Sequence, residues 1–487
     1  MKISKKKVFI VILIFIAISI FICMQSQMSP FSNSIPYTDS NVFKSTGYFI
    51  SKGMIPYKDF FDHKGIVLQL INYLGFLLNN DFGIWVLEVF SMFISCIYCF
   101  KIAFLYTKSN KASMLTTICV MISLIGFLEG GNLVEEYTIP FTLISLYIFN
   151  KYLLGYDVSF KGIVILGICF SIVFNLRANM VLMWEIYCGY IFIDCIIKKK
   201  YKLLLNYCLS FLIGILLVFV PIIIYLGING ALYDYIFQTI IFNFTYLKNG
   251  ISSYLAMVND FSTSVVLFLS ISILIILLFK GEKEKRTMYI LNLICILINY
   301  VMIILSRNSY LHYGLVLVAF FVIPMSYFFN TLLININYSS KFNIDVILSL
   351  LILISLNVQP LHLQYTLIRD NKNSGTEKYY DEISKYIQNN TSKNDTIIVM
   401  GNNAYLYYKS DRLPASKYFY QSPISNISKH ISAKCISEIQ SNMPSVIIFE
   451  QSIDSKDRII KDLLSFVKQN YNRIKNVGNG NVYVINK

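Results

Sequence analysis

Long uninterrupted runs of hydrophobic residues alternate with short polar segments along most of the chain. A run of about 18 apolar residues can cross the ~30 Å hydrocarbon core of a bilayer as an α-helix. The runs are continuous rather than alternating, which favours helices over a transmembrane barrel. The pattern predicts about eleven spans, at residues 8–24, 84–107, 112–128, 138–154, 162–175, 180–197, 203–227, 262–279, 288–306, 312–333 and 343–359.

Basic residues cluster in every second connector between these runs, which predicts the orientation in the membrane. Cytoplasmic connectors carry an excess of Lys and Arg, so a cytoplasmic N-terminus and an extracytoplasmic C-terminus fit the distribution. The predicted protein is therefore a multi-pass protein of the cell membrane. The predicted inside connectors are Lys108–Lys111, Lys151–Lys161, Lys198–Lys202, Lys280–Arg286 and the segment around Lys341.

The first run follows Lys5, Lys6 and Lys7, so it could belong to a cleaved signal peptide. No small-x-small cleavage site follows it, and residue 22, before Cys23, is Ile rather than the small residue of a lipoprotein signal. An uncleaved first helix is the favoured interpretation.

Two outer segments are too long to be simple connectors. Residues 25–83 contain two stretches with apolar residues at helical spacing, Val42–Ser51 and Val67–Asn79, which predict amphipathic helices lying in the membrane interface. Residues 228–261 are rich in aromatic residues, which predicts an interfacial aromatic belt. These aromatic residues are Tyr233, Tyr235, Phe237, Phe242, Phe244 and Tyr246.

The composition changes at about residue 360, and helical and strand patterns then alternate, as in a small α/β domain. The predicted helices are Glu377–Gln388 and Ser455–Asn470, and the predicted strands are Thr396–Met400 and Ser445–Glu450. A Gly-Asn-Gly-Asn turn between Tyr471–Val477 and Val482–Ile485 predicts a hairpin. The expected fold is thus an α-helical polytopic domain, residues 1–359, followed by an extracytoplasmic α/β domain, residues 360–487.

Charge and cysteine content narrow the function. The net charge of +15 could suggest a nucleic-acid partner, but the lysines lie at the ends of apolar runs, as membrane topology requires. Nine of the ten cysteines lie in or beside predicted spans, where they act as small apolar side chains. We therefore expect neither nucleic-acid binding nor an external disulfide framework.

Four polar motifs fall in order on the predicted outer side. The first outer segment has an early acid, Asp39, followed by Gly53–Gly65, which reads Gly-Met-Ile-Pro-Tyr-Lys-Asp-Phe-Phe-Asp-His-Lys-Gly. The later motifs are Asn132–Phe141, Asn175–Asn179 and Arg307–Tyr313. Together, over residues 8 to 360, they resemble the outer loops of the GT-C membrane glycosyltransferases, closest to the bacterial aminoarabinose transferases and protein O-mannosyltransferase relatives.

The resemblance implies a reaction in which a sugar leaves a polyprenyl-phosphate carrier and joins an extracytoplasmic acceptor with inversion. The expected partners are that lipid-linked donor, membrane lipid, and a glycan, lipid or protein acceptor. Attack by a hydroxyl needs a carboxylate to take its proton, and Asp39 is the first candidate, with Asp62 and Glu135 as alternatives. The family's paired acids are incomplete here, because Ser40 follows Asp39.

The leaving lipid phosphate needs cations, and guanidinium groups can donate two parallel hydrogen bonds to it. The candidate substrate-binding residues are Lys58, Lys64, Glu136, Arg177, Arg307, His312 and Tyr313.

Metal use and the reaction class stay open at this point. Asp39, Asp62 and Glu135 offer hard oxygen ligands, so a divalent cation, Mg²⁺ or Mn²⁺, is possible. A lipid-linked sugar flippase or transporter is one alternative, although such proteins often show two repeated halves that are not evident here. A polysaccharide polymerase is another, but its main outer loop would come late in the chain, whereas the loop richest in polar residues here is the first.

Overall fold

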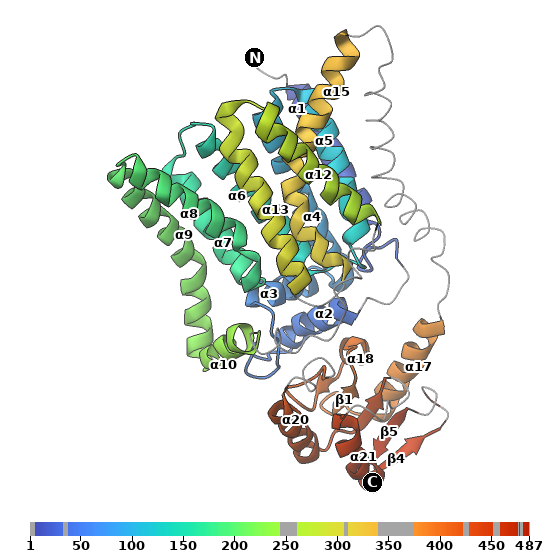
Figure 1. Ribbon diagram of the computed structural model, residues 1–487. Helices are drawn as coiled ribbons and strands as arrows, with labels where there is room; N and C mark the ends of the chain where they lie inside the picture. Colours follow the sequence, from blue (N-terminus) through green and yellow to red (C-terminus); the bar gives the residue numbers. More distant parts are fainter. Residues whose placement is uncertain are drawn as a thin grey trace. The chain divides into compact units, whose positions relative to one another are not determined.

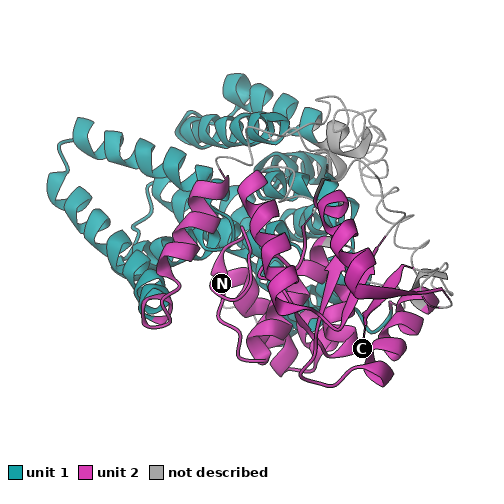
Figure 2. Cartoon of the chain, turned by 90° about the horizontal axis from the view of Figure 1, so that it is seen from below, with its two compact units in different colours: residues 1–31, 85–224, 250–370 teal, residues 32–84, 225–249, 371–487 magenta. Residues whose placement is uncertain are grey.

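A computed structural model of the full chain divides into two compact units. It describes residues 5–32, 38–243, 261–305, 310–338, 375–421, 428–450, 458–475, 477 and 481–486. The first unit comprises residues 1–31, 85–224 and 250–370, and the second comprises residues 32–84, 225–249 and 371–487. Figure 2 colours them separately and shows that the second unit combines the first outer segment with the C-terminal residues.

The first unit is a bundle of helices, as the hydropathy pattern predicts (Figure 1). Six helical stretches of the described residues are long and apolar enough to cross a membrane. Ten of the eleven predicted spans coincide with helices, and the eleventh, 343–359, lies outside the described residues. The count of eleven and the orientation of the termini remain predictions. The helices are α1 (Lys5–Cys23), α4 (Asn80–Thr107), α5 (Asn110–Ser123), α6 (Val134–Leu153), α7 (Phe160–Phe174), α8 (Leu182–Ile197), α9 (Tyr201–Ile228), α12 (Phe261–Lys280), α13 (Arg286–Leu305), α14 (Leu315–Val318) and α15 (Val322–Tyr338).

Short 3-10 segments join or extend several of these helices. They allow the chain to turn while its backbone groups stay hydrogen-bonded. The segments are η1 (Leu124–Phe127), η2 (Ala178–Met180), η4 (Lys283–Lys285), η5 (Leu311–Gly314) and η6 (Ala319–Phe321).

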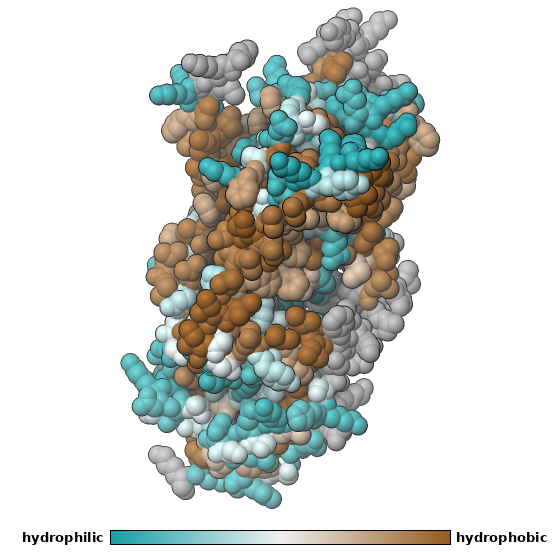
Figure 3. Space-filling view, turned by 90° about the vertical axis from the view of Figure 1, so that its left-hand side faces the viewer, coloured by the Kyte–Doolittle hydropathy of each residue, from teal (hydrophilic) through white to brown (hydrophobic). Residues whose placement is uncertain are grey.

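Small residues allow some helices of the first unit to approach closely. A Cβ atom on Gly167 of α7 would lie 2.2 Å from the carbonyl oxygen of Phe211 on α9, and one on Gly214 would lie 2.2 Å from that of Val164. The two backbones therefore cross in contact, as small residues permit in membrane helices. The opposite face of α9 exposes large apolar side chains such as Leu205, as a lipid-facing helix requires. Figure 3 looks at the side where α8 and α9 lie, and hydrophobic side chains cover much of it.

The C-terminal part of the second unit is an α/β domain with a five-stranded sheet in the order β2-β1-β3-β5-β4. Strands β2, β1 and β3 are parallel, and β5 pairs antiparallel with both β3 and β4. The predicted strands and the predicted terminal hairpin are confirmed. The strands are β1 (Thr396–Met400), β2 (Leu413–Pro414), β3 (Val446–Phe449), β4 (Tyr471–Ile474) and β5 (Val482–Ile485).

Among the residues that the structure describes, four helices accompany this sheet, and two of them were predicted. Strand β3 is buried at all four residues, which explains its uniformly apolar sequence. Helix α18 was not predicted because its apolar residues are contiguous rather than spaced along one helix face. Helix α20 was missed although Ile431, Cys435 and Ile439 recur every four residues. The helices are α17 (Gly375–Asn390), α18 (Tyr405–Ser410), α20 (Lys429–Asn442) and α21 (Arg458–Asn470).

The first outer segment forms two helices, α2 (Thr38–Ser51) and α3 (Ile66–Leu77), as predicted. They pack tightly, because a Cβ on Gly47 of α2 would lie 2.5 Å from the backbone carbon of Asn72 on α3. Helix α3 exposes an apolar face that includes Leu70, Leu74 and Leu77, which suits an interfacial helix. The prediction of an amphipathic surface helix is wrong for α2, because residues 40–49 are all buried.

The described part of the 228–261 segment forms α10 (Leu232–Ile236) and the π-helical turn η3 (Phe237–Ile241). The predicted aromatic belt is only partly present. Tyr233 is exposed, whereas Tyr235 is buried edge-on against Tyr57 with ring centres 5.2 Å apart. Phe244 and Tyr246 lie outside the described residues.

Candidate active site

Arg177 is the central cation of the polar cluster in the first unit. It lies in extended backbone between the end of α7 and η2, so its side chain is not committed to a helix face. Its Nη1 donates to Oε1 of Glu135 at 2.5 Å, and its Nη2 donates to the hydroxyl of Tyr313 at 3.3 Å. The guanidinium carbon also lies 4.9 Å from the centre of the Tyr313 ring. The structure thus brings together three of the predicted site residues.

Glu135 reaches this cluster from the first turn of α6. An acidic side chain is favourable at a helix N-terminus, because the unpaired backbone N–H groups give that end a positive potential. The Glu135 side chain is 2% exposed and the Arg177 side chain 18%. A carboxylate so deeply buried requires a partner, and Arg177 supplies it.

His312 lies on η5, beside Tyr313. Its Nδ1 contacts Oε2 of Glu129, and its backbone N–H donates to the same oxygen at 3.3 Å. The Tyr310 ring is stacked on the imidazole at 5.3 Å, and the Tyr313 ring lies edge-on to it at 4.9 Å. The imidazole is therefore fixed in orientation next to the Arg177 cluster.

Glu136 has a different environment from its neighbour Glu135. Its Oε2 accepts the backbone N–H of Leu133 at 3.4 Å, which caps the start of α6. The preceding turn is held by Glu88 of α4, whose Oε1 accepts the backbone N–H of Asn132 at 2.5 Å. The sequence predicted that Glu136 binds substrate. In the structure its carboxylate instead contacts the backbone of its own turn, and substrate binding stays a prediction.

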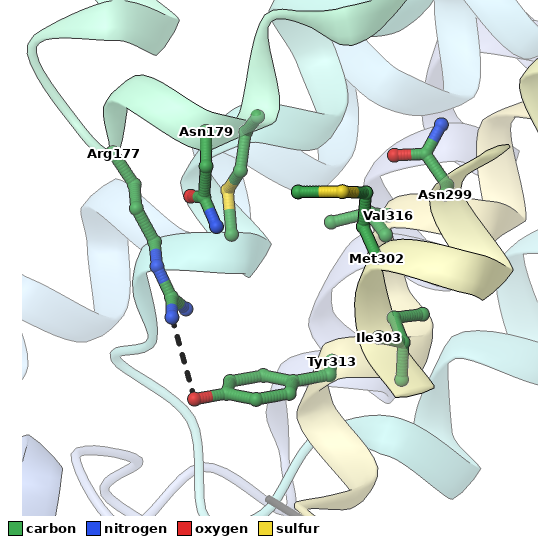
Figure 4. A pocket seen from close by; sticks show the side chains of 8 residues that line it. Arg177, Asn179, Asn299, Met302, Ile303, Tyr313 and Val316 are labelled. Carbon is green, nitrogen blue, oxygen red and sulfur yellow. Dashed lines mark hydrogen bonds between the residues drawn. The ribbon is translucent and has the colours of Figure 1, made fainter. Parts of the chain in front are cut away.

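A small pocket opens next to Arg177 (Figure 4). The figure shows the guanidinium and the Tyr313 hydroxyl at one side of it, joined by their hydrogen bond. The remaining wall is mixed, with two amides and several apolar side chains. The lining residues are Arg177, Asn179, Met180, Asn299, Met302, Ile303, Tyr313 and Val316. Arg307, predicted to bind the phosphate, lies outside the described residues.

Asp39 lies in the second unit, in the first turn of α2. Its side chain is partly exposed, unlike the buried residues 40–49 that follow it. The positive N-terminal end of α2 stabilises a carboxylate at this place.

Asp62 lies in the Gly53–Gly65 motif, which forms a loop with several turns. The Asp62 side chain is fully buried, and its oxygens accept the backbone N–H of Lys64 at 3.0 Å and Nε2 of Gln69 at 3.2 Å. Burial raises the pKa of Asp62 to about 6, although these hydrogen bonds and the Lys64 charge oppose the rise.

The rest of the motif is also held by local contacts. Tyr57 adopts a left-handed backbone conformation with φ of 66°, and its hydroxyl donates to the Lys64 carbonyl at 2.9 Å. The Asp59 carboxylate accepts the Ile55 N–H at 2.6 Å. Lys58 is exposed, and its ammonium donates to the Asn229 carbonyl at 3.0 Å. Most polar groups of this motif that we describe therefore stabilise the conformation of the loop itself.

The carboxylates predicted as metal ligands do not form a metal site within either unit. Across the described ranges, no group of three or more His, Cys, Asp or Glu side chains is placed to hold an ion. Asp62 and Glu135 already accept hydrogen bonds from protein donors. The donor set thus does not fit a metal within one unit, and the divalent cation remains a prediction.

Sequence reasoning missed two acidic residues of this region, Glu88 and Glu129. Glu88 was hidden inside a predicted span, where a single carboxylate among apolar residues is costly and marks a special role. Glu129 lies in the predicted outer connector, just before the Asn132–Phe141 motif, and only the fold brings it to His312.

Comparison with solved structures identifies the fold. ArnT from Cupriavidus metallidurans bound to undecaprenyl phosphate matches with a TM-score of 0.62 at 10% identity, over 99% of this chain and 98% of that chain. The same protein in the apo state gives a TM-score of 0.59 at 10% identity, with the same coverage. The oligosaccharyltransferase of Archaeoglobus fulgidus tethered with an acceptor peptide gives 0.56 at 11% identity, over 91% and 69% of the two chains. The chain has the GT-C fold of membrane glycosyltransferases.

The sequence family is more specific. Residues 1–358 match the family described as "Putative competence-induced protein Ccs4 N-terminal domain", and the chain belongs to this family. A comparison with curated proteins finds no match.

Proposed function

We propose that the protein is a GT-C glycosyltransferase that moves a sugar from a polyprenyl-phosphate donor to an extracytoplasmic cell-envelope acceptor. The observation that carries the proposal is the Glu135–Arg177–Tyr313 cluster beside a partly apolar pocket, in a chain with the GT-C fold. Fold likeness alone does not specify chemistry, so the cluster is the stronger argument. The solved ArnT structure with undecaprenyl phosphate supports the same class of lipid donor.

In the proposed reaction, the oxygen of an acceptor hydroxyl forms a bond to the anomeric carbon of the sugar. The bond between that carbon and the phosphate oxygen breaks, and its electron pair leaves with the polyprenyl phosphate. The hydroxyl proton passes to the Asp39 carboxylate, which is partly exposed and therefore accessible to an acceptor. Attack opposite the phosphate inverts the anomeric centre.

Arg177 stabilises the charge of the departing phosphate. A guanidinium has five N–H donors in a planar fork, which exceeds the two hydrogen bonds that Arg177 makes to Glu135 and Tyr313. These contacts fix the plane of the group before the donor arrives, so little reorganisation is needed when charge develops. The Met302, Ile303 and Val316 side chains of the adjoining pocket suit the first isoprenoid units.

The other predicted residues take supporting roles. Glu135 holds Arg177, and His312, oriented by Glu129, contributes a polar edge beside Tyr313. Arg307, Lys58 and Lys64 remain candidates for further phosphate contacts. Asp62 and Glu136 accept hydrogen bonds from backbone N–H groups of their turns. We therefore assign Asp62 to structure rather than to proton transfer, and Glu136 to structure rather than to substrate binding.

Mass analysis of envelope glycans in cells with and without this chain tests the proposal. We expect one sugar to disappear when the chain is absent, and to return with the unaltered chain but not with Asp39→Asn. The lipid-linked sugar should accumulate on the outer face, whereas loss of a flippase would leave it on the cytoplasmic face. An unchanged glycan composition would contradict the proposal.

A further inference from the structure

The first turn of α2, which carries Asp39, is held by the C-terminal α/β domain within the second unit. Asn41 is fully buried, and both ends of its carboxamide are used: Nδ2 donates to Oδ1 of Asn403 at 2.8 Å, and Oδ1 accepts the Tyr408 hydroxyl at 2.6 Å. Figure 1 shows α18, which carries Tyr408, next to α2. Two side chains from residues more than 360 positions later thus bind one side chain beside Asp39.

The same face of α2 continues this interface along the helix. The hydroxyl of Ser45 donates to the Ala404 carbonyl at 2.9 Å. Lys44 lies over the Tyr408 ring at 4.0 Å, and the hydroxyl of Tyr48 donates to Asp411 at 2.9 Å. Asn41, Ser45 and Tyr48 are spaced by four and three residues, so they lie on one helix face.

Lys52 extends this stripe by a further turn, with its ammonium 2.6 Å from the Asp411 carboxylate. A single exposed ion pair of this kind contributes little. Four successive contacts on one face fix the rotation of the helix about its axis.

The receiving side of the interface is itself fixed. Glu450, which follows β3, accepts the backbone N–H groups of Asn402 at 3.0 Å and Asn403 at 2.8 Å, and also the Tyr380 hydroxyl at 3.0 Å. The Asn403 Oδ1 also accepts the Tyr405 N–H at 3.0 Å, and its Nδ2 donates to Tyr380 at 2.9 Å. Asn403 is thus bound on every polar group of its side chain, at the carboxyl ends of β1 and β3.

We propose that Asn41, Asn403 and Tyr408 are positioning residues, through which the C-terminal domain holds the first turn of α2 and hence the Asp39 carboxylate. The first turn of a helix lacks intrahelical partners for its N–H groups and frays easily. A general base must stay within hydrogen-bond reach of the proton it removes, so a frayed turn lowers the rate. This inference rests on the proposed function, because it gives the C-terminal domain a role in the same reaction.

Tyr408→Phe tests the inference with the smallest change. It removes only the hydroxyl that donates to Asn41 and keeps the ring beneath Lys44. Tyr471→Phe in β4 is the matched control, because its hydroxyl has no hydrogen-bond partner among the described residues. Both variants are made in the full chain in lipid nanodiscs and supplied with a set of undecaprenyl-phosphate-linked sugars and envelope extract as acceptor.

Two readouts are measured, hydrogen exchange and the rate of undecaprenyl phosphate release. We expect Tyr408→Phe to speed exchange at the amides of residues 38–45 roughly tenfold, while the amides of β1 and β3 keep their protection. We also expect kcat to fall roughly tenfold with an unchanged KM for the donor, because the donor contacts at Arg177 are untouched. Tyr471→Phe should change neither.

The double variant Asn41→Ala, Tyr408→Phe shows whether Tyr408 acts through Asn41. We expect it to be no slower than Asn41→Ala alone, because both remove the same hydrogen bond. Additive losses would overturn the inference, and so would wild-type exchange in Tyr408→Phe. Faster exchange with an unchanged kcat would also overturn the inference. If Asp39→Asn is inactive in the same assay, the proposed function remains intact. An active Asp39→Asn protein would instead contradict the function, whatever Tyr408→Phe does.

Discussion

Two aspartates of the first outer segment carry the same charge in different surroundings. Asp39 is partly exposed in the first turn of α2, at a helix end that favours a carboxylate. Asp62 is fully buried in the Gly53–Gly65 loop and accepts hydrogen bonds from Lys64 and Gln69. Burial raises the pKa of Asp62 to about 6, and its side chain has no exposed surface on which to meet an acceptor hydroxyl.

The motif richest in charged residues therefore need not contain the reacting group. The Gly53–Gly65 motif uses its acids to close a turn, whereas the solitary Asp39 is left accessible. In our proposal, the C-terminal domain holds the first turn of α2 in place through its hydrogen bonds to Asn41. Variants of Asp39 and Asp62 separate these two roles.

Asp39→Asn should have the largest effect. An amide cannot take the acceptor proton, so we expect transfer to fall by about 10²–10⁴-fold while expression and folding stay normal. Release of undecaprenyl phosphate measures the rate, and size-exclusion chromatography measures folding. Asp59→Asn is the control, because its amide oxygen can still accept the Ile55 N–H. Normal activity of Asp39→Asn would remove Asp39 as the base.

Arg177→Lys should come next. Lysine keeps the charge but cannot bind Glu135, Tyr313 and a phosphate in one plane, so we expect kcat to fall by about 10²-fold. Transfer rates measured over a series of donor concentrations give kcat and KM. Arg286 is an exposed residue at the start of α13, so Arg286→Lys should leave kcat and KM unchanged. Equal losses in both variants would argue against a specific role for Arg177.

Asp62→Ala should act on stability rather than on the reaction. It leaves the Lys64 N–H and the Gln69 amide without an acceptor in a buried place, which costs about 1–3 kcal/mol. Thermal unfolding should therefore shift to lower temperature, while the rate per folded molecule stays within about twofold of the unaltered chain. A stable Asp62→Ala protein that transfers no sugar would instead make Asp62 a catalytic residue.

The stability of the C-terminal sheet should depend on pH because of Glu450. Burial raises the pKa of Glu450 to about 7, against the opposing hydrogen bonds from Asn403, Tyr380 and Asn402. The folded carboxyl thus holds its proton more tightly than the unfolded one, and its stabilising contribution is complete below about pH 4. The contribution is lost as the pH rises towards 7, by up to about 1.4 kcal/mol per pH unit.

Hydrogen exchange of the β1 and β3 amides, corrected for the intrinsic rate, measures this slope. Glu450→Gln should remove it, because the amide does not titrate. A slope that persists in Glu450→Gln would assign the pH dependence to another group.

Much of the fold could be predicted from the sequence because hydropathy acts locally. Helices coincide with ten of the predicted spans, and the terminal hairpin follows from its Gly-Asn-Gly-Asn turn. The burial of α2 could not be predicted, because its partner α18 lies more than 350 residues away and has no pattern of its own.

The site was harder to predict than the fold. Arg177, Glu135 and Tyr313 were each selected, but their mutual contact depends on how α6, η2 and η5 pack. Glu129 was missed because its partner His312 is distant in sequence. Asp62 was an alternative to Asp39 as the base, since a sequence gives charge and spacing but not exposure.

The most direct measurement is sugar transfer by the purified chain in nanodiscs, with undecaprenyl-phosphate-linked sugars as donors and envelope extract as acceptor. We predict stoichiometric release of undecaprenyl phosphate and a product of inverted anomeric configuration, both formed about 10²–10⁴-fold more slowly with Asp39→Asn. Movement of the intact lipid-linked sugar across the bilayer without release, or release by Asp39→Asn at the rate of the unaltered chain, would contradict this prediction.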